Sequence, residues 1–273
     1  MNSLYRFHWW TYILIGLVAV LILAPFGWMI STALMTTSQT LRVPPSLLPW
    51  PITFQGLEQV FQRLPFFTLL SNTFVAAILR MIGTLIVGML AAYALAVIKV
   101  PGARVILVVI LTLIMVPGDI FIIPNYVVVS SLHLTNTLVA LVLPEMFDVF
   151  AVFLLYQFFR GIPRELVEAA RIDGASHLRI LATIVVPISW NGITTVALLA
   201  LLAEWKDFLW PIIVNGSIDK LTVGPGLALL SGQYTTQWNV LMSAGVLAAL
   251  PMVIIFLILQ KQFIASVARS GMK

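Results

Sequence analysis

The chain alternates between long apolar runs and shorter polar segments. Each apolar run has roughly 20 residues, long enough to cross the hydrocarbon core of a bilayer as one helix. The runs predict six membrane spans, at about residues 12–31, 72–98, 105–123, 137–159, 182–202 and 239–260. The pattern therefore predicts an all-α fold in which residues 1–273 form a single polytopic transmembrane helical bundle.

Proline residues interrupt this pattern at two places. Pro117-Gly118 and Pro124 lie near the end of the third predicted span, where a kinked or interrupted helix is expected because proline removes helical hydrogen bonds. In the proline-rich loop at 32–71, Thr53 is expected to cap a short helix. Four apolar residues are spaced to share one face of that helix: Phe54, Leu57, Phe61 and Leu64.

Composition supports a membrane protein and excludes other classes. Hydrophobic residues make up 61% of the chain and charged residues 9%, which is too little polar surface for a soluble globule. The net charge of +5 is not arranged as a basic stripe, so the expected environment is membrane lipid and no nucleic-acid partner is predicted. There is no cysteine, and the three histidines are too scattered for a zinc cluster, so no metal or cofactor site is expected.

The distribution of lysine and arginine predicts the orientation. Ten of these residues fall in segments that the six spans place on one side: Arg6, Lys99, Arg104, Arg160, Arg164, Arg171, Arg179, Lys261, Arg269 and Lys273. Four fall on the other side, namely Arg42, Arg63, Lys206 and Lys220. Because cytoplasmic loops carry the excess of positive charge, both termini and the segment 160–179 are predicted to face the cytoplasm.

The longest polar interruption with a helical signature is the segment 161–187. Pro163 suits a first helical turn, and the residues after it are mostly good helix formers. Asp173-Gly174 is a helix stop, because glycine readily adopts the left-handed conformation of a C-terminal cap. A cytoplasmic helix is therefore predicted at about 163–174, followed by a second helix that leads into the fifth span.

This cytoplasmic helix has two interpretations. Four of its residues are small or apolar enough to enter a partner's groove, namely Leu166, Val167, Ala169 and Ala170. Glu168 could then pair with an arginine of the partner. An amphipathic helix lying on the membrane surface satisfies the same pattern, and periodicity alone leaves both interpretations open.

Charged residues inside the predicted spans need partners. Arg80 is eight residues from Asn72, and Glu145 is eight residues from Thr137, so both reach roughly 12 Å into spans that enter from the same face. An unpaired charge there costs at least about 2.5–3.5 kcal/mol. Arg80 is therefore predicted to pair with Glu145 or Asp148, as a static ion pair or as part of a solute pathway. The same three residues are the candidates for ion coupling if the chain is a secondary transporter.

Sequence signatures of enzymes are missing. The chain has no His-Glu-x-x-His, no Gly-x-Ser-x-Gly and no G-x-x-x-x-G-K-[ST] phosphate loop. No catalytic residue is therefore predicted, and the chain cannot itself be an ATPase.

The polar segment carries a specific motif. Its spacing is Glu168-Ala169-Ala170, three residues, Gly174, nine residues, then Ile184-Val185-Val186-Pro187. This closely resembles the EAA loop of ABC-importer permeases, with Val186 where leucine is usual. Further stretches resemble carbohydrate-importer permeases of the maltose-transporter type: Asn72-Thr73, 91–96, 117–124, Asn136-Thr137, 158–163, 204–211 and the tail 260–273. Lys206, where asparagine is usual, and the tail, which lacks a glycine-rich ending, depart from that family.

The resemblance implies a type I ABC-importer permease fold in the cell's inner membrane. It implies a permease subunit of an ATP-driven, binding-protein-dependent importer, for sugars or related polyols, or for a non-carbohydrate solute such as glycerol phosphate. The implied partners are a second homologous permease, a dimer of ATPase subunits that binds ATP and magnesium, and an extracytoplasmic solute-binding protein. The residues expected to couple to the ATPase are Arg164, Leu166, Glu168, Ala169, Ala170, Asp173 and Gly174.

Overall fold

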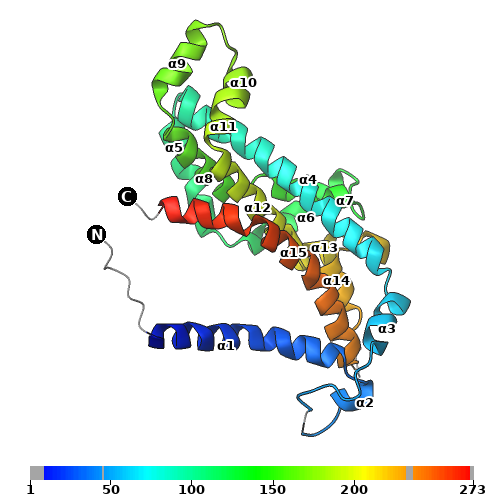
Figure 1. Cartoon of the computed structure of the whole chain (residues 1–273). Coiled ribbons are helices and arrows are strands. Elements are labelled where there is room, and N and C mark those ends of the chain that lie inside the picture. Colours follow the sequence, from blue (N-terminus) through cyan, green and yellow to red (C-terminus); the bar gives the residue numbers. More distant parts are fainter. Residues whose placement is uncertain (1–8, 45, 232–235, 271–273) are drawn as a thin grey trace. The chain divides into compact units, whose positions relative to one another are not determined.

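The computed structural model describes residues 9–44, 46–231 and 236–270, with no side chains at 259 and 261–270. Within these ranges the regular structure is helical (Figure 1). Three of the described helices are individually long and apolar enough to span a membrane. They are α1 (Trp9–Ala33), α4 (Phe66–Tyr93) with its π-helical end η1 (Ala94–Ile98), and α15 (Trp238–Ser270).

Three further candidate spans are each built from helices that meet at a bend. The first joins α5 (Ala103–Thr112) and η2 (Leu113–Met115) to η3 (Gly118–Phe121) and α6 (Ile122–Ser131), with a bend of 98°. The second joins α7 (Leu138–Val142) and η4 (Leu143–Met146) to α8 (Val149–Arg160), with a bend of 49°. The third joins α10 (His177–Ile180), η5 (Leu181–Val185) and α11 (Val186–Ile188) to α12 (Trp190–Lys206), with a bend of 87°. Counting each bent pair as one span gives six spans among the described residues.

The remaining described helices are short. They are α2 (Thr37–Thr40), α3 (Gln55–Arg63), α9 (Arg164–Ile172), α13 (Leu209–Val214), η6 (Ile218–Lys220) and α14 (Val223–Ala228).

The interruption expected near Pro117 is confirmed, but the third span does not end at residue 123. Val116, directly before the proline, is extended with φ −89° and ψ 121°. This is the conformation that a following proline imposes, because its ring disfavours the helical region for the preceding residue. The helix then resumes and continues to Ser131, so the span is longer and bent.

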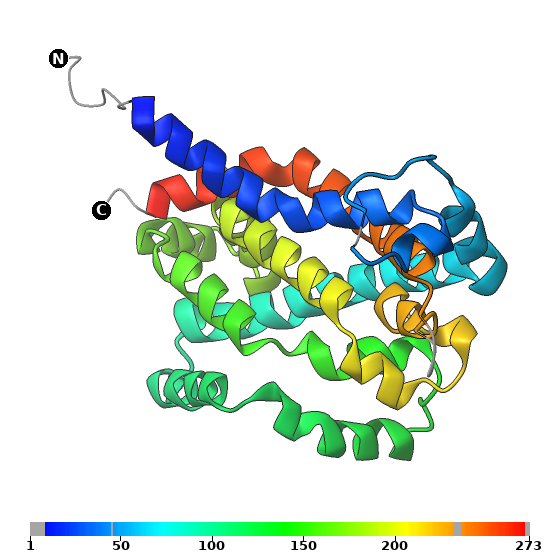
Figure 2. The ribbon, with the colours of Figure 1, turned by 90° about the horizontal axis from the view of Figure 1, so that it is seen from below.

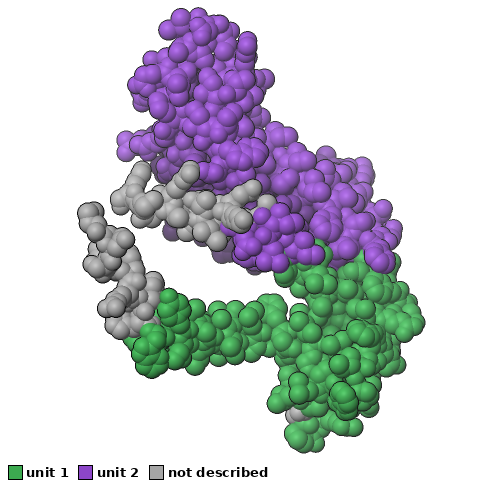
Figure 3. Space-filling view, in the orientation of Figure 1, with its two compact units in different colours: residues 1–66, 226–253 green, residues 67–225, 254–273 purple. Residues whose placement is uncertain are grey.

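The described residues group into two compact units, coloured in Figure 3. One draws on residues 1–66 and 226–253, and the other on residues 67–225 and 254–273. In the first unit, the Ser243 hydroxyl of α15 donates a hydrogen bond to the Ala33 carbonyl oxygen of α1 at 3.2 Å.

The orientation prediction rested partly on Arg6 and Lys273, which lie outside the described residues, and on Lys261 and Arg269, whose side chains are not described.

The short helix expected after Thr53 exists as α3, but its buried face is not the expected one. Gly56 and Val60 are buried, whereas Phe54 and Phe61 are exposed. Of the four residues expected on the apolar face, Leu64 is buried, and it is the C-cap residue of α3. A Cβ at Gly56 would lie 2.7 Å from the Asn239 carbonyl oxygen, so α3 meets α15 along its glycine side. Phe54 occupies the N-cap position without a side-chain hydrogen bond, and the Thr53 hydroxyl oxygen, one residue earlier, accepts from the Gln55 N–H at 3.2 Å.

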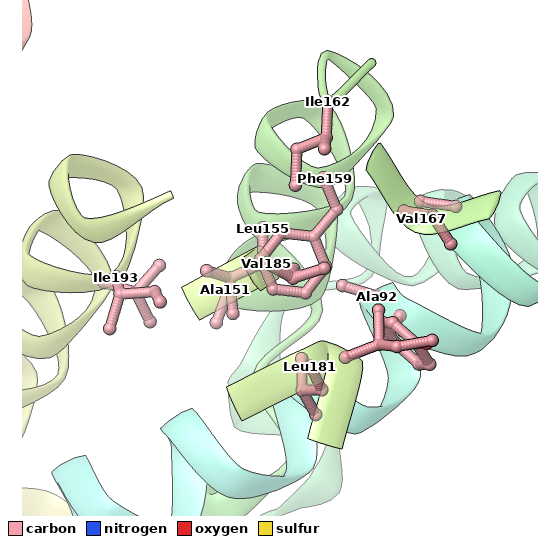
Figure 4. Close-up of a cluster of buried hydrophobic side chains, with 13 residues drawn as sticks. Ala92, Ala151, Leu155, Phe159, Ile162, Val167, Leu181, Val185 and Ile193 are labelled. Atoms are coloured by element: carbon pink, nitrogen blue, oxygen red, sulfur yellow. The ribbon is translucent and has the colours of Figure 1, made fainter. Parts of the chain in front are cut away.

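The second unit has a core of buried apolar side chains at the end that carries α9. Figure 4 shows side chains from α4, α8, α9, η5 and α12 converging there. The buried members are Ala92, Tyr93, Ala96, Ala151, Leu155, Phe159, Ile162, Val167, Ile180, Leu181, Val185, Ile193 and Val196. We call this group the α9-end core. The α9-end core joins α9 to three separate spans, because other members lie on α4, on α8 and on the span that contains η5 and α12.

Within this unit, α8 packs directly against α12 (Figure 2). Gly192 makes the close approach possible, because a Cβ there would lie 2.4 Å from Cδ2 of Phe158. Real Cβ contacts are essentially never that short, so a larger residue would force the Phe158 ring to move.

Hydrogen bonds hold the other end of the second unit. The Asn72 side-chain amide donates to the Asp219 and Leu221 carbonyl oxygens at 2.8 and 2.9 Å. The Trp210 indole N–H donates to the Ala140 carbonyl oxygen at 3.0 Å. Asn136 donates from its side-chain amide to the Ser217 hydroxyl at 2.9 Å. The bonds from Asn72 and Trp210 satisfy backbone carbonyl groups, and the bond from Asn136 joins two side chains.

Candidate functional site

The polar segment forms α9, which ends where the sequence predicted a stop. Gly174 has φ +78°, and its N–H donates to the Arg171 carbonyl oxygen at 3.0 Å. The Ala175 N–H donates to the Ala170 carbonyl oxygen at 2.9 Å. These two bonds are those of a Schellman motif, which closes a helix with glycine in the left-handed conformation. At the other end, Pro163 is the N-cap residue, one position before the first helical residue.

One face of α9 belongs to the protein's own core. Val167 is buried in the α9-end core, and Ala170 is half-buried against it. Val167 therefore cannot also fill a partner's groove, as the sequence-based expectation had it. The reason lies in the tertiary structure, because Val167 packs against apolar side chains at the ends of α4 and α8 and on the helix η5.

The other face of α9 is free. Five of the seven predicted coupling residues on this segment have exposed side chains: Arg164, Leu166, Glu168, Ala169 and Asp173. Gly174 is exposed as well, and Ile172 is 86% exposed. The helix α9 thus presents apolar and charged groups outward, while Val167 packs its inner side against the core.

Arg80 lies between two carboxylates. It is 8% exposed, and its Nη2 lies 2.8 Å from Oε2 of Glu145. Its Nη1 lies 3.3 Å from Oε2 of Glu204, a residue that is 1% exposed. The other carboxylate oxygen of Glu204 has no hydrogen-bond partner among the described residues. One guanidinium therefore compensates two carboxylates that reach it from separate spans.

Sequence reasoning did not assign Glu204 to this cluster. The predicted fifth span ended at residue 202, whereas α12 begins at Trp190 after a break and continues to Lys206. The available signal was the position of Glu204 at the start of the stretch 204–211, which resembles the permease family.

Asp148 has a different role from Glu145. It is the N-cap residue of α8, and its Oδ1 accepts a hydrogen bond from the Ala151 N–H at 2.9 Å. The bend in this span lies between η4 and α8, so Asp148 caps a helix that restarts inside a span. It thus satisfies a free backbone donor, and the structure does not bring it to Arg80 as an ion pair.

Replacing Asp148 by Ala is expected to lower the free energy of unfolding by about 1 kcal/mol, because the cap is lost. Asp148→Asn is the matched control and should retain most of the stability, since its side-chain oxygen still accepts from Ala151. Thermal unfolding of the purified protein in detergent measures both. Equal losses in the two variants would mean that the charge of Asp148, rather than its capping, stabilises α8.

Among the described residues, no group of three or more His, Cys, Asp or Glu side chains is placed to hold a metal ion.

The comparison with known proteins matches the described architecture. A family described as the inner membrane component of binding-protein-dependent transport systems matches residues 12–269. The chain belongs to this family. It is a multi-pass permease subunit of an ABC importer and not an enzyme, because ATP hydrolysis in such systems is carried out by a separate subunit. An ATPase and a solute-binding protein are therefore its partners, and ion-coupled secondary transport is not its mechanism.

Relatives cover most of the permease. It is 31% identical over 259 residues to the sn-glycerol-3-phosphate transport system permease protein UgpE of Yersinia enterocolitica, covering 92% of each chain. It is 32% identical over 244 residues to the arabinooligosaccharides transport system permease protein AraQ of Halalkalibacterium halodurans, covering 89% of the permease and 86% of the relative. A crystal structure of a bacterial ABC transporter involved in the import of the acidic polysaccharide alginate matches with a TM-score of 0.83 and 21% identity. That match covers 96% of the permease and 99% of the other chain, and the shared fold is the type I importer fold.

Proposed function

We propose that this permease imports a carbohydrate, or a related polyol or its phosphate, together with a second homologous permease above a dimer of ATPase subunits. The substrate class rests on its relatives, one named for arabinooligosaccharides and one for sn-glycerol-3-phosphate. Glycerol phosphate is the second candidate, because relatives of that name are 30–31% identical over 92–95% of the chain.

The coupling proposal rests on one observation: one face of α9 is buried in the protein's own core, and the opposite face is exposed. Its outer face, with Glu168 and Ala169, is free to dock on an ATPase. Its inner face is fixed by Val167 to α4, α8 and η5. A rigid helix held in this way would transmit ATPase closure to several spans at once and switch access from one side of the membrane to the other.

The proposed orientation places α9 and both termini on the cytoplasmic side. Lys99, Arg104, Arg160, Arg164 and Arg171 gather around one cavity at the α9 end of the second unit. Such an excess of cations favours the cytoplasmic side. On this proposal ATP and magnesium bind only in the partner ATPase, and the chain itself holds no cofactor.

Purification of the permease from its native membrane with its operon partners tests this function. We expect the ATPase and the second permease to co-purify, and vesicles with internal ATP to take up a labelled oligosaccharide or glycerol 3-phosphate only when the solute-binding protein is present. Uptake of amino acids or metal ions instead would overturn the substrate class. Uptake by the permease alone, driven by an ion gradient, would overturn the coupling to an ATPase.

A further inference from the structure

A cavity of about 920 Å³ lies beside α9, between η1, α5, α8 and α9. Five cations and one carboxylate line it: Lys99, Arg104, Arg160, Arg164, Arg171 and Glu168. The coupling role proposed for the outer face of α9 uses Glu168, which also lines this cavity, but it does not use Lys99, Arg104 or Arg160.

The cations of this cavity are the next feature that needs an explanation. Among the described residues, none of the five side chains makes an ion pair or a side-chain hydrogen bond. The preference of cations for the cytoplasmic side explains which end of the spans they occupy. It does not explain why cations from separate segments share one cavity, because like charges brought together repel each other.

A helix N-terminus adds to the positive potential of the cavity. Gly102 is the N-cap residue of α5 and has no side chain to accept hydrogen bonds from the first-turn N–H groups. The first turn of α5 contains no acidic residue and instead contains Arg104. A cation at this end of a helix is unfavourable with respect to the helix dipole, whereas a bound anion is favourable.

The rest of the cavity wall is apolar. Leu95, Leu107, Val108 and Phe159 line it beside the cations. A wall that is part cationic and part apolar fits a ligand that carries both a negatively charged group and a hydrocarbon chain. Basic pockets between spans on the cytoplasmic side are known to suit phospholipid headgroups.

We propose that this cavity binds a phosphate group, supplied by an anionic phospholipid such as phosphatidylglycerol. The guanidinium and ammonium groups would hold the phosphate, and the apolar wall would receive the first part of the acyl chains. Bound lipid would then fix the ends of α5 and α8 next to α9. The proposal does not depend on which solute the permease carries.

The test uses the whole transporter in nanodiscs with phosphatidylcholine and increasing phosphatidylglycerol. The variant is Lys99→Gln/Arg104→Gln/Arg160→Gln, which leaves α9 unchanged. Its matched control, Arg42→Gln/Arg179→Gln/Lys220→Gln, removes the same charge outside the cavity lining. Native mass spectrometry measures retained phosphatidylglycerol, and we expect about a fivefold loss of affinity for each cation removed from the cavity. The control should retain wild-type binding.

A second measurement keeps the proposal falsifiable if the triple variant does not fold. Thermal stability of the wild type and of Arg104→Gln is followed with short-chain phosphatidylglycerol, with phosphatidylcholine, and with inorganic phosphate. Stabilisation of the wild type by phosphatidylglycerol that weakens in Arg104→Gln supports the proposal. Stabilisation by inorganic phosphate alone would keep the phosphate site but overturn its lipid source. Equal lipid retention in both triple variants, or no stabilisation by either phosphate ligand, would overturn the site.

Discussion

Replacing Arg80 by Met is expected to remove most of the folded permease from the membrane. The change leaves Glu204, which is 1% exposed, without the cation 3.3 Å away, and Glu145 loses its partner at 2.8 Å. Removing one partner of a buried ion pair typically destabilises a protein by about 3–5 kcal/mol, because the other charge stays buried and uncompensated. The amount of membrane-integrated protein and its thermal unfolding in detergent measure the effect.

Second-site changes distinguish the contributions of Glu204 and Glu145 to the loss of folded protein. Arg80→Met combined with Glu204→Gln should restore part of the folded protein, because the fully buried carboxylate is removed together with its cation. Arg80→Met combined with Glu145→Gln should restore less, since the Glu145 side chain is 38% exposed and more easily hydrated. The charge swap Arg80→Glu/Glu145→Arg should also recover only part of the folded protein. Glu204 keeps its carboxylate at the site, and the swap moves the cation away from it. Equal rescue by all three second-site changes would show that the cluster does not depend on Glu204.

Replacing Gly174 by Val is expected to abolish transport while the protein still accumulates in the membrane. A β-branched residue resists the φ of +78° at this position, and holding one there costs about 1–3 kcal/mol. The Schellman bonds that close α9 would break or shift, and the exposed Glu168 would lose its fixed position. Transport and binding-protein-stimulated ATP hydrolysis in reconstituted vesicles measure the result. Gly161→Val is the matched control, because Gly161 caps the neighbouring helix with an ordinary φ of −76°.

Glu168→Ala tests the same assignment without backbone strain. If Glu168 pairs with a desolvated cation of the ATPase, its loss costs about 2–5 kcal/mol at that contact, and transport should fall by at least about tenfold. Glu165→Ala, on the same helix and also exposed, should transport normally. Wild-type transport by both Gly174→Val and Glu168→Ala would show that α9 does not couple to the ATPase through these residues.

Much of the helical architecture follows from local properties of the sequence. Runs of apolar residues predicted the three unbroken helices α1, α4 and α15, because a helix satisfies its own backbone hydrogen bonds in lipid. The bounds are less well predicted: α4 begins at Phe66 rather than at residue 72, and α15 continues past residue 260 to Ser270. The stop at Asp173-Gly174 was also predictable, since a glycine in the left-handed conformation is a local backbone property. The placement of Arg80 near Glu145 followed from counting eight residues from Asn72 and eight from Thr137.

The tertiary structure decided which side chains meet where helices are broken. The helix α12 starts after a bend of 87° before Trp190, and it carries Glu204 to within 3.3 Å of Arg80. A similar break before α8 turns Asp148 into a helix cap. The burial of Val167 and the gathering of five cations around one cavity depend on how separate helices pack at one end of the second unit. Local sequence patterns specify where a helix can begin and end, but contacts between helices depend on the rotation and offset of each one, which only packing determines.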